Sequence, residues 1–272
     1  MSISSRLGVL MAASIIGLAG CSPATVDDYP TFEPKEVVDL GALVTEDLPQ
    51  RVWGAGYLAS RGFGEGNTFD VIKWEGGSEG GRIYGSNAYY TLFNHGGPHI
   101  DAPNHISVGG GLDTYPVEDF SGPLKVFDVR DYPPGRSVPE EVFSGLVKPG
   151  DVVLIFTEYA PPEADDEIPE VITLTPAAAE YLANLPVRAF GTDAWSVFSP
   201  QDNSLVEAPT ETAAAAPIHH AFLSRGIPIY EQLFSVARLL NRSESESMHF
   251  VGVPLNIEDG DGMIVRPVVF VY

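Results

Sequence analysis

Glycine and proline are spread along the whole chain, and they limit the length of every helix and strand that the sequence can form. The 272 residues include 28 glycines and 23 prolines, without an internal repeat or a low-complexity tract. Proline interrupts helices and glycine weakens them, so many short elements joined by tight turns are expected, not a helical bundle. Hydrophobic residues make up 44% of the chain, which is enough for a sizeable core. We therefore expect a globular, strand-rich domain.

The charge balance is strongly acidic and restricts the partners of the chain. Aspartate and glutamate number 37 against 15 lysines and arginines, for a formal net charge of -22. Such a charge repels phosphate backbones and anionic lipid headgroups at long range. Nucleic acid is therefore not expected as a partner, and most of the acidic residues are expected on a solvated surface.

The first twenty residues have the features of an export signal. Residues 1–6 are short and polar with one arginine, residues 7–16 are mostly apolar, and Leu-Ala-Gly leads to Cys21. The apolar stretch is shorter than the roughly 20 residues that a membrane-spanning helix needs. We expect residues 1–20 to be a signal peptide, residues 21–34 a polar, proline-containing tether, and residues 35–272 the folded domain.

Cys21 is the only cysteine, so an intramolecular disulfide is excluded. Leu-Ala-Gly-Cys resembles a bacterial lipobox, which implies that Cys21 carries a lipid. Ser22 behind it is consistent with the outer membrane. The resemblance implies a lipid anchor in the bacterial cell envelope, facing the periplasm, with no other membrane contact. The alternative is an unmodified thiol that follows an ordinary signal peptide.

Hydrophobic patterning predicts an α/β fold. The apolar run at 151–159 is typical of a strand covered on both faces. Residues 175–185 combine a threonine cap, a proline at the first helical position and apolar residues at helical spacing, and a buried strand follows, as in an α/β crossover. The other predicted elements are strands at 36–44, 68–74, 87–95, 122–131, 187–195, 227–231, 249–257 and 264–272, a helix at 216–226, glycine-rich loops at 54–67 and 75–85, and an acidic loop at 160–170.

Residues 94–105, NHGGPHIDAPNH, contain half of the six histidines. Pro98 and Pro103 exclude a helix, so the segment is expected to be loop and extended chain. In extended backbone His99 and Asp101 point to one face, and the two glycines allow His95 to fold back toward them. Imidazoles and a carboxylate converging on one point suit zinc or manganese, and an aspartate has a second oxygen for another ion. The alternative is a set of unpartnered histidines in a surface loop.

A second group of candidate ligands lies later in the chain. His219 and His220 fall in the first turn of the predicted helix at 216–226, and Glu231 ends the strand that follows. A helix N-terminus disfavours imidazolium, which keeps the ring neutral and available as a ligand or a base. Taken alone, a histidine pair and a distant glutamate are weak evidence for a site, and ordinary residues of a helix surface are the better interpretation.

The motif His95-Gly-Gly-Pro-His99-Ile-Asp101-Ala-Pro-Asn-His105 resembles the HxGTHxDxPxH signature of the metal-dependent cyclase-like hydrolases. That family includes bacterial kynurenine formamidases and isatin hydrolases. The resemblance extends over most of residues 35–272, from VVDLGALV near the start to GVPLNIEDGDGMIVRPVVFVY at the end. Glu231 follows His219 by twelve residues, which matches the spacing of the family's later histidine and glutamate. This spacing favours His219 over His220 as the ligand.

The resemblance implies a swivelling β/β/α single domain with a mixed sheet and short helices, assembled as a homo-oligomer. It implies a divalent metal cofactor, zinc or manganese, as one or two ions. His95, His99 and Asp101 would hold the first, and the second would lie between Asp101 and the later pair, His219 and Glu231.

In the same family reading, His105 would transfer the proton or serve as a further ligand, and Trp53 falls near an aromatic segment where it would contact the substrate. The implied reaction is hydrolysis of an amide-type C–N bond in a small molecule, such as an arylformamide or a cyclic amide like isatin. A bound ion lowers the pKa of its water toward about 7 and so supplies the nucleophile.

Two departures from the family pattern leave a second function open. Pro98 replaces the usual threonine, and Met263-Ile264 stand where Ser-Pro is common. The alternative is a non-catalytic metal- or ligand-binding lipoprotein derived from the same fold. His105 and Glu231 favour the enzyme, because ion capture alone would not need a spare proton carrier.

Overall fold

The computed structural model describes residues 32–45, 47–48, 69–79, 82–160, 170–197, 216–243 and 245–272. Contacts separate residues 1–33 from a compact unit formed by residues 34–272, and every element below belongs to that unit. The signal peptide, most of the tether, Cys21, Trp53, the glycine-rich loop predicted at 54–67 and all but the end residues of the acidic loop predicted at 160–170 lie outside the described residues, so the expectations for them stay predictions. Within the described part of the chain, no helix combines the length and the apolar character of a membrane span.

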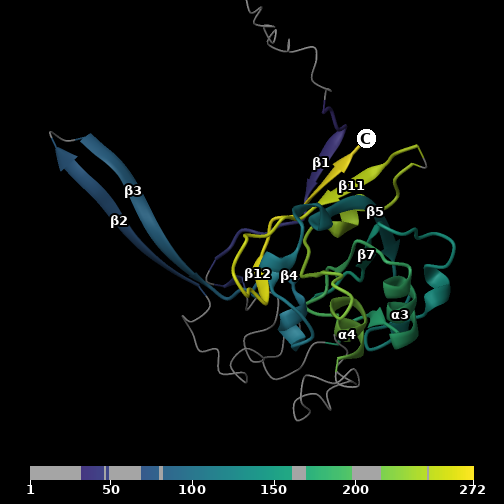
Figure 1. Ribbon diagram of the computed structural model, residues 1–272. Coiled ribbons are helices and arrows are strands. Elements are labelled where there is room, and N and C mark those ends of the chain that lie inside the picture. Colours follow the sequence, from purple (N-terminus) through teal and green to yellow (C-terminus); the bar gives the residue numbers. More distant parts are fainter. Residues whose placement is uncertain are drawn as a thin grey trace, which may run out of the picture. The chain divides into compact units, whose positions relative to one another are not determined.

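Among the described residues, nine strands form one mixed sheet (Figure 1). These strands are β1 (Glu36–Asp39), β4 (His99–Asp101), β5 (Ser121–Asp128), β7 (Val152–Phe156), β9 (Ala189–Thr192), β10 (Ile229–Glu231), β11 (Met248–Val251), β12 (Gly262–Ile264) and β13 (Val268–Val271). Their order is β1-β13-β11-β5-β7-β9-β10-β4-β12. The central strands β5, β7, β9 and β10 are mutually parallel, and the outer pairs are antiparallel. This arrangement confirms the expected α/β fold with a mixed sheet.

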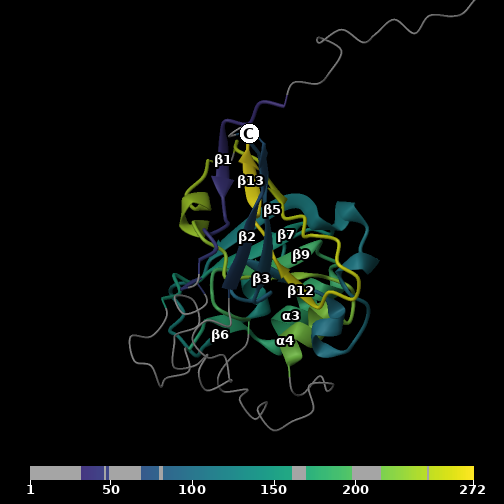
Figure 2. The ribbon, with the colours of Figure 1, turned by 90° about the vertical axis from the view of Figure 1, so that its left-hand side faces the viewer.

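Two short α-helices, α3 (Pro176–Asn184) and α4 (Pro217–Leu223), lie side by side on one face of the sheet (Figures 1 and 2). Thr175 caps α3, since its side-chain oxygen accepts a hydrogen bond from the amide of Ala178 at 3.1 Å. Each helix has a proline at its first position, as predicted. Short 3-10 helices lie at Pro103–Ile106, Leu112–Thr114, Val117–Phe120, Glu140–Val142 and Val236–Leu239.

The strand β7 is buried on both faces, which confirms the prediction from its continuous apolar run. Val153 and Ile155 pack into the cluster that includes α3 and α4. Val152 and Leu154 enter a second cluster on the opposite face, with side chains from β10, β11 and β13. Full burial of such a side chain contributes about 1.5–3 kcal/mol. The first cluster therefore joins one face of β7 to the two helices. The second joins its other face to side chains of β10, β11 and β13.

The prediction of a glycine-rich loop at 75–85 is wrong. Residues 75–79 and 82–85 belong to an antiparallel pair of strands, β2 (Phe69–Glu79) and β3 (Arg82–Leu92), which forms a separate two-stranded sheet. Glu75 pairs with Ser86 and Gly76 pairs with Gly85. Glycine lowers the strand propensity of a segment, but the ladder is built from backbone groups that glycine also carries. A third small sheet pairs β6 (Ser137–Val138) with β8 (Thr173–Leu174) in parallel.

The strands predicted at 249–257 and 264–272 are shorter in the structure. The first ends at Val251 with β11, and the second is divided between the end of β12 and the start of β13. The break falls at Arg266 and Pro267. Proline has no backbone N–H to donate to a ladder, so the chain leaves one neighbour there and joins another.

Candidate metal centre

The strand β4 places two of the predicted ligands on one face. His99 and Asp101 alternate with Ile100, which enters the core on the other side. Pairing of β4 with β10 is antiparallel and sets His99 directly opposite Glu231. The local extended backbone and the strand register together bring a histidine and two carboxylates to the same side of the sheet.

Three further histidines reach this face from neighbouring segments. His95 lies in the turn that precedes β4, where the amide of Gly96 donates to the carbonyl of Phe93 at 3.0 Å. His105 lies in the 3-10 helix that begins at Pro103, so the proline expected to prevent a helix instead starts this short one. His219 lies in the first turn of α4, as predicted.

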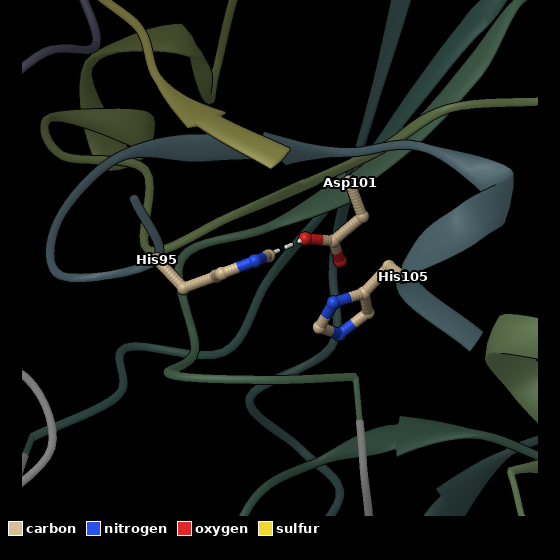
Figure 3. Close-up of side chains that lie close together, drawn as sticks. All are labelled: His95, Asp101 and His105. Carbon is tan, nitrogen blue, oxygen red and sulfur yellow. Dashed lines mark ion pairs between the residues drawn. The ribbon is translucent and has the colours of Figure 1, made fainter. Parts of the chain in front are cut away.

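Asp101 is the centre of the group. Its Oδ1 lies 3.0 Å from Nδ1 of His95 and 3.2 Å from Nε2 of His99, and its Oδ2 lies 3.7 Å from Nε2 of His219. Figure 3 shows the rings of His95 and His105 next to each other and beside this carboxylate, with an ion pair joining His95 to it. The rings of His95 and His105 are 4.4 Å apart between centroids.

Glu231 completes the group on the β10 side. Its Oε2 lies 3.6 Å from Nε2 of His99, and its Oε1 lies 3.5 Å from Nε2 of His219. All the candidate ligands except His105 are buried, whereas the side chain of His105 is 31% exposed. The structure therefore brings together all six predicted site residues of the two histidine clusters, and their individual roles remain predictions.

The donors fit a divalent cation. Asp101 is fully buried, yet neither of its carboxylate oxygens accepts a hydrogen bond from the described residues. A buried carboxylate without such partners is costly, and a cation bound among imidazole nitrogens would satisfy it. Among the residues that the structure describes, ligand atoms within 4.8 Å of one another form two groups, one of His95, Asp101 and His105 and one of His99, Asp101 and Glu231. These groups divide the residues differently from the predicted ligand sets, but both share Asp101.

The pKa values reflect burial and close charges. Burial lowers the pKa of His99 and lowers that of His219 to about 4, so both rings are neutral at neutral pH. The predicted cause for His219 was the helix dipole, whereas burial is the main one. Burial also acts on His95, but contacts with carboxylates, first that of Asp101, raise its pKa to about 10. Burial and the charge of Asp101 raise the pKa of Glu231 well above its usual range. Two buried carboxylates so close together favour a shared cation.

Backbone groups orient two of the ligands. Nδ1 of His99 lies 2.8 Å from the carbonyl oxygen of Gly97, and because a carbonyl only accepts, Nδ1 carries the proton. The unprotonated Nε2 then faces Asp101 and Glu231. The Oε1 of Glu231 accepts from the amide of Val197 at 2.7 Å and from the hydroxyl of Ser196 at 3.1 Å. Both ligand atoms are therefore held before any ion binds.

The sequence reasoning missed Asp261, which contacts both His95 and His105. It lies immediately before β12, in an acidic, glycine-containing turn. Because Glu258 and Asp259 stand in the same turn, composition alone could not single out Asp261. It also missed Gln232, which follows Glu231 in the left-handed region with φ of 60° and donates to the carbonyls of His95 and Trp195. Nothing in the local pattern indicated either contact.

Comparison with known proteins places these residues in a family context. The model of the putative cyclase family matches residues 24–197. A kynurenine formamidase from Salinibacter ruber is 32% identical over 179 residues, which cover 65% of this chain and 76% of the relative. One from Bacillus cereus is 30% identical over 184 residues, covering 66% and 77%.

Solved structures share the fold. The crystal structure of an isatin hydrolase bound to the product analogue thioisatinate superposes with a TM-score of 0.68 at 20% identity, covering 87% of this chain and 92% of the other. A predicted metal-dependent hydrolase from Bacillus stearothermophilus superposes with a TM-score of 0.57 at 25% identity, covering 86% and 98%. These shares of the chain are larger than residues 24–197 alone provide, so the shared fold extends beyond residue 197.

Proposed function

Because the chain belongs to the putative cyclase family, we propose that it is a metal-dependent hydrolase of an amide-type C–N bond. The observation that carries the proposal is the fully buried Asp101, whose two carboxylate oxygens face imidazole nitrogens and accept no hydrogen bond from the described residues. The relatives named kynurenine formamidase, the isatin hydrolase fold and the metal-dependent hydrolase fold support the same reaction class.

In this proposal, His95, His99 and Asp101 hold a divalent cation, and Asp101 with His219 and Glu231 holds a second where two are bound. The cation, zinc or manganese, supplies a water of lowered pKa and polarises the substrate carbonyl. The neutral rings of His99 and His219 suit binding without prior loss of a proton. Burial of these ligands excludes bulk water from the bond that is cleaved.

His105 is the residue that moves the proton. It is the most exposed of the six side chains, and its ring lies 4.4 Å from that of His95 and 5.8 Å from that of His219. This position suits an imidazole that takes a proton during attack on the carbonyl and delivers it to the departing amine. Such a role contributes about 10²- to 10⁴-fold in rate.

The substrate class is a compact amide, either an arylformamide or a cyclic amide of the isatin type. It is supported by the likeness of the chain to kynurenine formamidases and to the isatin hydrolase structure. Trp53 is proposed as a wall of the substrate site. It lies outside the described residues, so its proposed role rests on the sequence.

The two departures from the family motif do not favour the non-catalytic alternative. The carbonyl of Pro98 accepts a hydrogen bond from the amide of Val265 at 2.8 Å, which links the turn before β4 to the end of β12. Met263 pairs with Ile100 and packs into the same core cluster, on the side of β4 away from the metal ligands. Pro98 and Met263 are thus accommodated without displacing a ligand.

The test combines metal content with turnover. Purified protein loaded with zinc or manganese is assayed against a formylated aromatic amine, isatin and a lactam. We expect His105→Ala to retain the ion and to lose about 10²- to 10⁴-fold in kcat, while His99→Ala loses the ion. Bound metal without turnover of any of the three substrates would contradict the proposed hydrolase, and full activity of His105→Ala would contradict its role.

The cellular context is also proposed from the sequence. A lipid on Cys21 would anchor the protein in the bacterial envelope, with the folded unit facing the periplasm as a homo-oligomer. Replacement of Cys21 by serine should release the protein from membranes and leave its metal content unchanged. Unchanged membrane association would contradict lipidation, and a monomer in size-exclusion chromatography with light scattering would contradict the oligomer.

A further inference from the structure

We propose that Asp261 is a positioning residue that holds His95 and His105 in the orientations needed for metal binding and proton transfer. The inference rests on the proposed function for the roles of the two histidines. It adds a carboxylate that the family signature at 94–105 does not contain and that joins the ligand and the proton carrier through one side chain.

The contacts of Asp261 with the two rings carry the argument. Its Oδ2 lies 3.2 Å from Nε2 of His95 and 3.6 Å from Nδ1 of His105. The other nitrogen of His95, Nδ1, lies 3.0 Å from Oδ1 of Asp101. His95 is therefore held between two carboxylates, with one nitrogen directed to the centre and the other to Asp261. A carboxylate on the outer nitrogen of a ligating histidine fixes the tautomer and the ring plane.

Asp261 is itself fixed by the chain that carries the ligands. Its Oδ1 accepts a hydrogen bond from the side-chain amide of Asn94 at 2.8 Å, and its carbonyl accepts from the amide of Ala102 at 2.9 Å. Asn94 directly precedes His95, and Ala102 directly follows Asp101. The turn before β12 is thus tied to both ends of the segment that holds the first three ligands.

The residue that follows Asp261 explains how the turn comes so close to the ring. A Cβ atom at Gly262 would lie 2.5 Å from Cε1 of His95 and 2.8 Å from the carbonyl oxygen of Ile100. Only glycine permits this approach of β12 to His95. The close packing at Gly262 and the three contacts of the Asp261 carboxylate, with His95, His105 and Asn94, leave it little freedom to turn away from the two rings.

Because the side chain of Asp261 is partly exposed, its effect on the two rings can be tested without unfolding the protein. Its side chain is 48% exposed, whereas Asp101 and Glu231 are buried. Removal of its charge should therefore leave the fold intact and act on the two rings. Asp259 offers a matched control, because it is an exposed acid in the same turn with φ of 52°, a conformation that asparagine tolerates.

The experiment compares Asp261→Asn and Asp259→Asn with the wild type. Zinc affinity is measured by competition with a chromogenic chelator, and kcat and KM are measured with zinc at saturation. Asp261→Asn should weaken zinc binding roughly 10- to 100-fold and should lower kcat more than it raises KM. Asp259→Asn should match the wild type in both measurements, and circular dichroism should show both variants folded.

Wild-type zinc affinity in Asp261→Asn would overturn the proposal. An equal loss in Asp259→Asn would also overturn it, because the effect would then belong to the charge of the turn and not to the contact. The affinity measurement needs no turnover. A wild type that binds zinc but cleaves no amide would refute the proposed hydrolase, while the comparison of affinities would still decide the role of Asp261.

Discussion

Replacement of Asp101 by asparagine should abolish the stabilisation of this protein by zinc or manganese. Asp101 is the only residue that both candidate ligand groups share, and its two oxygens contact three of the histidines, counted among the described residues. Asparagine keeps the size of the side chain but removes the charge and half of the oxygen ligands. Either metal group should therefore fail in this variant.

The magnitude follows from linkage between binding and folding. An ion that binds only the folded state stabilises it by about 2.7 kcal/mol when its concentration is 100 times Kd. For a chain of this size, each kcal/mol raises Tm by about 2–4 °C. The wild type should therefore gain roughly 5–11 °C on addition of the metal to protein treated with a chelator, and Asp101→Asn should gain nothing.

The assay is thermal unfolding followed by circular dichroism, with and without the metal. Each variant is compared with itself, so any change in the stability of the metal-free protein cancels. Asp39→Asn is the matched control, because Asp39 is an exposed acid on β1 that pairs with Arg266 at 2.6 Å and touches no candidate ligand. It should show the wild-type gain. A full metal-induced rise in Asp101→Asn would refute the assignment of the centre to this carboxylate.

Three further substitutions test the surroundings of the site. Gly262→Ala should displace the ring of His95 and weaken metal binding, with an overpacking cost of about 1–3 kcal/mol in chemical unfolding; unchanged affinity would show that the ring does not need this space. Phe222→Ala removes a fully buried ring of α4, the helix that also carries His219, from its stack on Phe190 of β9, and it should lower the free energy of unfolding by about 3–5 kcal/mol; a loss below about 1 kcal/mol would contradict this packing. Burial raises the pKa of Asp193 above its usual value, so the stability that its protonated form gives is present at acidic pH and is lost as pH rises through the folded-state pKa. The side chain in Asp193→Asn stays neutral at every pH. The free energy of unfolding of this variant in urea, minus that of the metal-free wild type, should therefore increase from about pH 4 to pH 7, and a constant difference would contradict the raised pKa.

Local patterns in the sequence were sufficient where a short segment determines its own conformation. Alternation along 99–101 predicted that His99 and Asp101 share a face, and the threonine cap and proline predicted the start of α3 at Pro176. The continuous apolar run predicted that β7 is covered on both faces. In the first two cases the residues that decide the conformation lie a few positions apart along the chain. In the third, an apolar side chain at every position of β7 is buried whichever neighbours it meets.

Contacts between distant segments could not be derived in the same way. Asp261 lies 166 residues from His95 along the chain, and only the pairing of β12 with β4 brings the two together. Strands were predicted at 68–74 and 87–95, but the part of the β2–β3 hairpin between them was read as a loop because its glycines give no alternating pattern, while the ladder depends on backbone pairing. The division of the last predicted strand at Pro267 likewise depends on which neighbour each half finds in the sheet.

The central claim is that a divalent cation binds among the histidines and carboxylates around Asp101. Elemental analysis of the purified protein, after exposure to zinc and manganese and removal of loosely bound ions, tests it most directly. We predict about one or two tightly held ions per chain in the wild type and in Asp39→Asn, and none in Asp101→Asn. A wild type that retains neither metal, or an Asp101→Asn variant that retains as much as the wild type, would contradict the account.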